Sequence, residues 1–255
     1  MVFDEYAAYY DLLYRDKDYV GEAEYIDQLL RGAMGGSKRL SILELGCGTG
    51  KHATLLNEMG HTVCGIERSH EMLRQAKERT KNTEGLSFIE SDIRDFRLNQ
   101  TFDVAMALFH VMSYQVETEG FLAVLQNVYE HLREGGVFVF DTWYGPAVLT
   151  ERPELRVKRL KGEKHQITRI AEPVMRANED IVDVNYDVFI QDKHDGAVKE
   201  IQEIHTMRYY FLPEIKLMLK LCDFQLEKCC EFMTERELGE TTWGSLFVAR
   251  KGSGA

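Results

Sequence analysis

The sequence has 255 residues with 44% hydrophobic and 29% charged side chains, a balance typical of a globular chain that can bury a full core. Its net charge of −11 argues against a general nucleic-acid-binding surface, because phosphate binding needs clustered lysine and arginine. No apolar run reaches membrane-span length, and the N-terminus lacks the basic-then-apolar pattern of a signal peptide. The five cysteines have no C-x-x-C spacing, so we expect reduced thiols in a cytoplasmic protein, with no metal site.

The N-terminal residues 2–32 are rich in tyrosine, and apolar residues recur at helical spacing between positions 19 and 30. This pattern predicts a helix preceded by an aromatic segment. Two roles fit that segment: it packs over one end of a sheet, or it forms a lid over a ligand.

The segment from Ser41 to Gly50 reads Ser-Ile-Leu-Glu-Leu-Gly-Cys-Gly-Thr-Gly. Its continuous apolar start predicts a buried strand, and the three alternate glycines predict a tight turn. Residues 51–59 then have helical spacing, with Gly60 available to end the helix. Strand, turn and helix together direct free backbone N–H groups toward a ligand at the carboxyl edge of a parallel sheet.

The spacing G-x-G-x-G differs from the dinucleotide motif and from the phosphate-binding P-loop. Residues 61–67 predict a second strand that ends in Glu67, roughly 20 residues after the first glycine, where an acid accepts hydrogen bonds from ribose hydroxyls. The pattern therefore favours a ribose-bearing ligand without a pyrophosphate. The alternative is an accidental glycine-rich turn, which the acid in register disfavours.

The run Glu-Leu-Gly-Cys-Gly-Thr-Gly followed by Gly-Ile-Glu resembles the first two motifs of the class I S-adenosylmethionine-dependent methyltransferases. The resemblance covers nearly the whole chain and implies an α/β fold: a Rossmann-like seven-stranded sheet with helices on both faces, and S-adenosyl-L-methionine as cofactor. The segment Tyr-Ala-Ala-Tyr-Tyr-Asp-Leu-Leu-Tyr is similar to the start of small-molecule members, especially those that N-methylate nucleotide-linked amino sugars. A catalytic tyrosine of some such enzymes would fall near Val2 or Phe3, where this chain departs from the pattern.

The segments after Glu67 resemble the later motifs of this family, in the same order and at similar spacing. Ser69 is a good N-cap for a helix over 70–77, in which Met72 suits either the core or a place near the adenine. Residues 86–90 predict a third strand, and the resemblance places Asp92 and Ile93 at the adenine, the alternative being a solvated loop acid. The residues assigned to the cofactor are Tyr10, Glu44, Gly46, Cys47, Gly48, Gly50, Glu67, Arg68, Met72, Asp92, Ile93 and Leu108.

Residues 102–109 predict a fourth strand, and the loop after it opens on the same edge as the glycine turn. The resemblance makes His110 and Tyr114 candidate catalytic residues, with Tyr114 near the position of a catalytic histidine in the family. Histidine takes up a proton near neutral pH, whereas tyrosine, with an ordinary pKa of about 10, is better suited to orienting a nucleophile. The residues assigned to the acceptor are Tyr6, Trp143, Tyr144 and Trp243, with capping of the sheet edge as the alternative for the aromatic pair at 143–144.

Residues 118–132 predict an amphipathic helix closed by Gly135 and Gly136, followed by a fifth strand over 137–141. Alternation between about 155 and 211 predicts an inserted antiparallel β meander of three or four strands. A last helix then starts at Leu212–Pro213, and a hairpin over 225–232 and 246–250 closes the sheet. We therefore divide the chain into an N-terminal helical lid (1–32), a cofactor-binding core (33–150 and 212–251) and an inserted sheet (151–211) that lies over the acceptor and offers a surface for a homodimer.

The leading interpretation is methyl transfer to N or O of a small polar metabolite, with an amino sugar on a nucleotide carrier as the first candidate. The chain has no Asn-Pro-Pro-Tyr or Asp-Pro-Pro-Tyr step after the fourth strand, which argues against methylation of planar base or amide nitrogens. The alternatives are a methyltransferase that acts on tRNA or protein and a non-catalytic regulatory module that binds the cofactor. The many aromatic residues at the acceptor edge disfavour the regulatory module.

Overall fold

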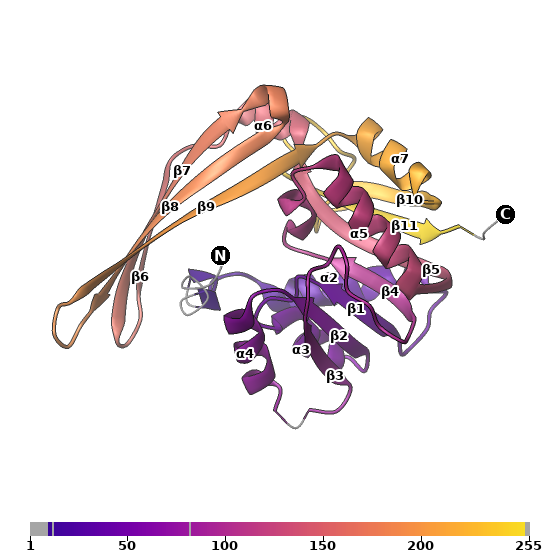
Figure 1. Ribbon diagram of the computed structural model, residues 1–255, viewed down its shortest axis with the longest axis horizontal. Coiled ribbons are helices and arrows are strands. Elements are labelled where there is room, and N and C mark those ends of the chain that lie inside the picture. Colours follow the sequence, from indigo (N-terminus) through magenta and orange to yellow (C-terminus); the bar gives the residue numbers. More distant parts are fainter. Residues whose placement is uncertain (1–9, 12, 82, 253–255) are drawn as a thin grey trace.

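The computed structural model describes residues 10–11, 13–81 and 83–252, and in this part of the chain seven strands form the central sheet, in the order β3-β2-β1-β4-β5-β11-β10 (Figure 1). The strands are β1 (Ser41–Leu45), β2 (Thr62–Glu67), β3 (Leu86–Glu90), β4 (Phe102–Ala107), β5 (Leu132–Tyr144), β10 (Phe224–Glu231) and β11 (Gly244–Lys251). β1 to β5 run parallel, and β11 is antiparallel to both β5 and β10. The predicted seven-stranded α/β sheet is confirmed.

Helices cover both faces of this sheet because each strand alternates its side chains between two apolar clusters. Along β5, Phe138 and Phe140 join the cluster that α5 and α7 cover, whereas Val137 and Val139 join the cluster that α2 and α3 cover. The helices are α2 (Tyr19–Ala33), α3 (Lys51–Glu58), α4 (His70–Arg79), α5 (Thr118–His131), α6 (Gly145–Glu151) and α7 (Leu212–Leu221), with short 3₁₀ turns η1 (Val111–Tyr114) and η2 (Ala177–Glu179). No helix in the described ranges is long and apolar enough to cross a membrane.

The predicted meander is a four-stranded antiparallel arm between β5 and α7, and Figure 1 shows it extending away from the central sheet. Its strands are β6 (Arg156–Lys161), β7 (His165–Arg176), β8 (Ile181–Asp192) and β9 (Val198–Tyr210). β9 returns beside the end of β5, where Trp143 pairs with Tyr209 and Tyr144 with Tyr210. Apolar side chains of the arm also pack around Leu13, so the arm and the N-terminal segment face each other across the carboxyl edge of the central sheet.

The prediction that Gly135 and Gly136 close the preceding helix is wrong. The helix α5 ends at His131, Leu132 already has extended dihedral angles, and β5 starts there. The glycines lie inside β5, where the register with β4 shifts between the pairs that Phe102 and Val104 make. A Cβ atom at Gly136 would lie 3.0 Å from the Asp103 carbonyl oxygen, so glycine is needed for the close approach of the two strands.

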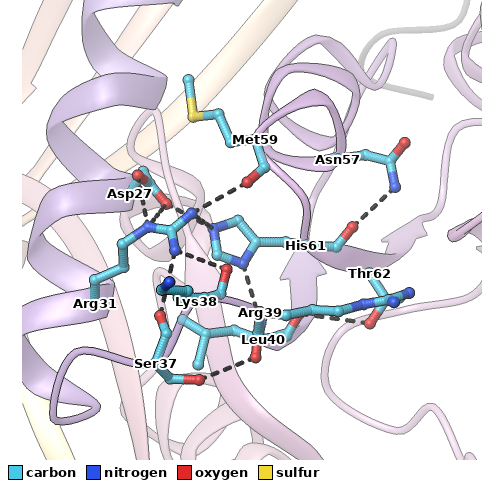
Figure 2. Close-up of polar contacts among 10 residues, drawn as sticks. All are labelled: Asp27, Arg31, Ser37, Lys38, Arg39, Leu40, Asn57, Met59, His61 and Thr62. Atoms are coloured by element: carbon cyan, nitrogen blue, oxygen red, sulfur yellow. Dashed lines mark hydrogen bonds and ion pairs between the residues drawn. The ribbon is translucent and has the colours of Figure 1, made fainter.

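A buried polar network fixes α2 to the amino ends of β1 and β2 (Figure 2). His61 Nδ1 accepts the Leu40 N–H at 3.1 Å, so the ring proton is on Nε2, which lies 2.6 Å from an Asp27 carboxylate oxygen. Arg31 donates to the same carboxylate at 2.7 Å and to the Met59 carbonyl at 3.1 Å. The network lies at the amino edge of the sheet, whereas the glycine turn lies at the carboxyl edge. It therefore anchors α2 without contacting the glycine turn.

Candidate active site

A cavity of about 600 Å³ lies at the carboxyl edge of the sheet, a size suited to small-molecule ligands. Its walls come from the glycine turn after β1, the ends of β2, β3 and β4, the N-terminal segment and the inserted arm. The arm contributes Arg156, Tyr186 and the run 204–207 of β9. The cavity therefore has a wall of core residues on one side and a wall of arm residues on the other.

The three glycines of the turn have different surroundings, although all have positive φ. A Cβ atom at Gly46 would lie 2.7 Å from a Val111 methyl group, and one at Gly50 would lie 3.0 Å from the Phe88 ring. These two glycines are required by packing inside the protein. At Gly48 a Cβ atom would meet nothing within 4 Å, so this glycine is the one that leaves room on the cavity side.

Glu67 ends β2 and lines the cavity while its carboxylate accepts backbone N–H groups from Gly48 at 3.0 Å and Ser69 at 2.8 Å. Burial raises the pKa of Glu67, and these hydrogen bonds oppose the rise. A carboxylate offers about four acceptor positions, so Glu67 keeps capacity for a hydroxyl group of a ligand. The bonds to Gly48 and Ser69 also tie the glycine turn to the start of α4.

Glu44 is a second buried carboxyl group in the cavity wall, with only 3% of its surface exposed. Burial raises its pKa to about 8, and the negative charge of Glu67 adds to the rise. Its Oε2 atom has no hydrogen-bond partner among the described residues, and its Oε1 atom lies 3.9 Å from His52 Nδ1. A buried, incompletely partnered carboxyl group at a cavity wall favours a ligand that carries positive charge.

Asp92 lies after β3 and is held by Arg94, a partner that the sequence reasoning missed. Oδ1 accepts the backbone and Nε protons of Arg94, both at 2.9 Å, and Oδ2 accepts an Nη2 proton at 2.7 Å. These bonds to Arg94 lower the pKa of Asp92 although burial opposes them. The Asp-x-Arg spacing was the available signal, because an acid and an arginine two residues apart in a turn can form this closed pair.

His110 is held in position by Asp141 at the end of β5. Phe109 and His110 both have φ of +63°, a backbone conformation that costs free energy in residues other than glycine. One Asp141 oxygen accepts the His110 N–H at 2.9 Å, and the other lies 2.9 Å from the ring Nδ1. Asp141 is 1% exposed, so this buried carboxylate holds the strained backbone by a hydrogen bond, while its second oxygen lies close to the ring without forming a well-aligned hydrogen bond.

Tyr114 contacts the inserted arm through a chain of polar atoms. Its hydroxyl group lies 2.8 Å from His205 Nδ1, and His205 Nε2 lies 3.0 Å from an oxygen of Glu203. Burial raises the pKa of Tyr114 well above its usual value. The sequence reasoning missed His205 and Glu203, although their spacing of two residues on a strand places them on one face.

Comparison with known proteins gives matches along the whole chain. A family model described as a methyltransferase domain matches residues 42–136. The chain is 27% identical over 226 residues to the dTDP-3-amino-3,4,6-trideoxy-alpha-D-glucopyranose N,N-dimethyltransferase of Streptomyces venezuelae, covering 88% of this chain and 91% of that protein. An S-adenosylmethionine-dependent methyltransferase of Clostridium acetobutylicum superimposes with a TM-score of 0.82 at 21% identity, over 98% of both chains. DesVI of Streptomyces venezuelae superimposes with a TM-score of 0.79 at 25% identity, over 95% of this chain and 97% of its own.

Residues 42–136 therefore carry a methyltransferase domain, and the chain is an S-adenosylmethionine-dependent methyltransferase. Its cofactor is S-adenosylmethionine, and the core side of the cavity fits that molecule. Glu67 has acceptor capacity for a ribose hydroxyl, and the carboxyl group of Glu44 faces a ligand that is itself a cation. Gly48 leaves open space, and apolar Met72 and Ile93 line the same wall.

The methyltransferase cavity brings together most of the residues that the sequence pointed to. Those that line it are Tyr10, Glu44, Gly46, Cys47, Gly48, Glu67, Arg68, Met72, Asp92, Ile93, Leu108, His110, Tyr114 and Trp143. Their individual roles in binding and catalysis stay predictions.

Three predicted site residues do not line the methyltransferase cavity. Gly50 faces the interior at Phe88. Tyr144 follows Trp143 on β5 and so points to the opposite face of the strand. Trp243 packs against the Trp143 ring at 6.2 Å between centroids, and its Nε1 donates to Glu151. The predicted acceptor contact Tyr6 lies outside the described residues.

Proposed function

We propose that this methyltransferase methylates the amino nitrogen of a small polar acceptor, an amino sugar carried on a nucleotide. The observation that carries the proposal is the arm, which encloses the acceptor side of the cavity with aromatic, imidazole and guanidinium groups. Aromatic rings suit the apolar faces of a sugar, and the polar groups suit its hydroxyl and amino substituents. The curated relative from Streptomyces venezuelae, which acts on such an amino sugar, supports the same acceptor class.

The chemistry requires little covalent participation from the chain. When bound, S-adenosylmethionine supplies a methyl group that its sulfonium already activates. The protein has to hold the acceptor nitrogen in line, exclude water and receive the proton that the nitrogen loses. Trp143 and His110 line the cavity and are suited to positioning, while Tyr114 is suited to hydrogen bonding with the acceptor.

The basic side chains of the arm are suited to the diphosphate of a nucleotide carrier. Arg156 lines the cavity at the start of β6. Arg169 lies behind the cavity wall, over the Tyr186 ring at 5.0 Å, and donates to the hydroxyl group of Tyr14 at 3.3 Å; both tyrosines line the cavity. Guanidinium groups recognise phosphate oxygens through paired N–H donors, so this end of the cavity favours an anionic acceptor.

A tRNA or protein acceptor fits less well. The net charge of −11 disfavours a polyanion, and the arm with the N-terminal segment encloses the cavity from two sides. A macromolecule would have to displace one of these walls before its target atom reached the cofactor.

The test is methyl transfer by the purified protein with S-adenosylmethionine and three classes of acceptor: nucleotide-linked amino sugars, unfractionated tRNA and denatured protein. We expect mass spectrometry to find one or two added methyl groups on an amino sugar, and no transfer to its hydroxyl analogue that lacks the amine. Transfer to tRNA or protein alone would overturn the acceptor class while leaving the cofactor assignment intact.

We further propose that the protein works in the cytoplasm and forms a homodimer. All five cysteines are free thiols and four of them are buried, which supports a reducing compartment. Exposed valines on the arm at positions 157, 174 and 198 support its role in pairing subunits. Cell fractionation tests the compartment. Analytical ultracentrifugation tests the dimer: the wild type should sediment as a dimer, and the variant with serine in place of all three valines should sediment as a monomer.

A further inference from the structure

Three polar side chains form a chain from the cavity into the inserted arm. Tyr114 comes from η1, after β4, whereas His205 and Glu203 come from β9 of the arm. Tyr114 and His205 are 91 residues apart in the sequence. The joining distances are 2.8 Å from Tyr114 Oη to His205 Nδ1 and 3.0 Å from His205 Nε2 to Glu203 Oε2. His205 is 3% exposed, so this chain of groups is buried at its centre and reaches the cavity at Tyr114.

The Glu203 carboxylate determines where the protons lie on His205 and Tyr114. An ionised carboxylate only accepts hydrogen bonds, so Glu203 requires the His205 proton on Nε2. His205 Nδ1 then carries a lone pair and accepts the hydroxyl proton of Tyr114. Toward a bound acceptor, Tyr114 Oη therefore acts as a hydrogen-bond acceptor, which selects an N–H or O–H group of the substrate.

We propose that Tyr114, His205 and Glu203 form a proton relay that deprotonates the ammonium group of the acceptor before methyl transfer. This inference rests on the proposed amine acceptor. One N–H proton moves to Tyr114 Oη while the phenolic proton moves to His205 Nδ1. The acceptor nitrogen keeps the electron pair of the broken N–H bond and becomes nucleophilic. The imidazolium that forms is stabilised by the adjacent Glu203 carboxylate, and the proton passes to solvent when the product leaves.

Tyr114 requires this partner because its surroundings oppose a lasting phenolate. Burial raises the pKa of Tyr114, and the neighbouring Tyr186, Tyr14 and Glu203 raise it further, while Arg68 lowers it. The Tyr186 ring also packs edge-on against His205, at 4.8 Å between centroids. A tyrosine in such surroundings passes a proton on as it receives one, and His205 is the group placed to take it.

The test compares His205→Asn, His205→Phe and Tyr114→Phe with the wild type. Asparagine keeps an acceptor for the Tyr114 hydroxyl group but cannot take up a proton. We expect kcat to fall about 100-fold in all three variants, the loss typical for a general base. Turnover by His205→Asn should then rise about tenfold per pH unit below the pKa of the substrate amine, because only acceptor already neutral in solution can react. Affinity for S-adenosylmethionine should be unchanged.

Gln202→Ala is the matched control, because Gln202 is exposed and precedes Glu203 on the same strand. It should keep wild-type kcat and pH dependence. The relay is overturned if His205→Asn retains kcat, and equally if kcat and cofactor affinity fall together at every pH, which would show a structural role. Absence of transfer from the wild type to any amine overturns the acceptor assignment instead.

A second measurement needs no substrate. Nitrogen-15 NMR of the histidine rings, with His205 assigned from its variant, should show a neutral ring with the proton on Nε2. Glu203→Gln should shift protons toward Nδ1, because glutamine can also donate to Nε2. A ring with the proton on Nδ1 in the wild type would overturn the relay even if the enzyme methylates amino sugars.

Discussion

At the scale of single residues, Gly48 is the glycine of the turn whose substitution should affect cofactor binding without a packing clash inside the protein. Its φ of +54° disfavours a side chain, and the space beside it opens on the cavity. Gly48→Ala should cost about 1 kcal/mol of unfolding free energy, because alanine is strained at positive φ, and should also weaken cofactor binding by filling that space. Urea unfolding and calorimetric titration with S-adenosylhomocysteine measure the two effects.

Gly46→Ala is the comparison for Gly48→Ala, since its added methyl group would clash with Val111 inside the protein. We expect a larger loss of stability than at Gly48. Unchanged cofactor affinity in Gly48→Ala would show that this glycine serves the turn alone.

Glu44 should make both stability and cofactor binding depend on pH. Its pKa of about 8 is above the unfolded value of about 4.3, so its stabilising effect is complete below about pH 4.3 and is lost as pH rises from there to about 8. The unliganded wild type should therefore lose thermal stability between about pH 5 and pH 8, the interval between the unfolded and folded pKa values, and Glu44→Gln should lose less. Affinity for cationic S-adenosylmethionine should rise over the same interval in the wild type only. Parallel pH profiles of the two proteins would contradict this.

At the scale of elements, the anchor of α2 depends on one carboxylate. Burial raises the pKa of Asp27, but the hydrogen bonds from Arg31 and His61 outweigh it and hold the pKa below its usual value. A lowered pKa gives stability that is present above the unfolded value of about 3.9 and is lost as pH falls through the folded value. Asp27→Asn should therefore cost about 2 kcal/mol near neutral pH, the value of hydrogen bonds to a charged group.

The cost of Asp27→Asn should shrink as pH falls through the lowered folded pKa of Asp27 and should disappear once the wild-type carboxylate is itself protonated. Asp16→Asn is the control, because the Asp16 side chain is 64% exposed and its ion pair with Arg15, at 3.4 Å, is also exposed to solvent. A cost that stays constant down to acid pH would assign the effect of Asp27 to packing.

At the scale of the whole molecule, the short β5–β9 contact sets where the arm lies over the core. Gly145 follows this contact, and a Cβ atom there would lie 2.5 Å from the Phe211 ring. Gly145→Ala should move the arm and lower kcat/KM for the acceptor by about tenfold, since a misplaced acceptor loses in-line geometry. Cofactor affinity, measured by calorimetry, should stay at the wild-type value.

Gly32→Ala in α2 is the matched control for Gly145→Ala, because a Cβ atom there meets nothing within 4 Å. It should leave kcat/KM unchanged and slightly stabilise the helix. Equal losses of acceptor turnover and cofactor affinity in Gly145→Ala would contradict a separate role for the arm.

The sheet and the core wall of the cavity could be predicted because short segments of the sequence carry the signals for them. The glycine turn, the acid after β2 and the alternation of the arm are each contained in a short segment, so the sheet and the core wall of the cavity could be placed. The contact of Tyr114 with His205 spans 91 residues and depends on how the arm folds back, which no local pattern encodes. Gly135 and Gly136 carried a helix-stop signal, but Gly136 is required by the close approach of β4 and β5, and Gly135 suits its backbone φ of +72° inside β5.

The arm leaves the core at the end of β5 and re-enters it beside the same residues, since Tyr144 pairs with Tyr210. The two ends of such an insertion lie side by side in the core. Replacing the insertion by one of another length therefore changes the loop-closure entropy little, because this entropy depends only weakly on loop length. The arm also supplies the wall that faces the core wall across the cavity. Acceptor preference can therefore diverge by replacement of one continuous segment, 156–210, while the cofactor machinery is inherited intact.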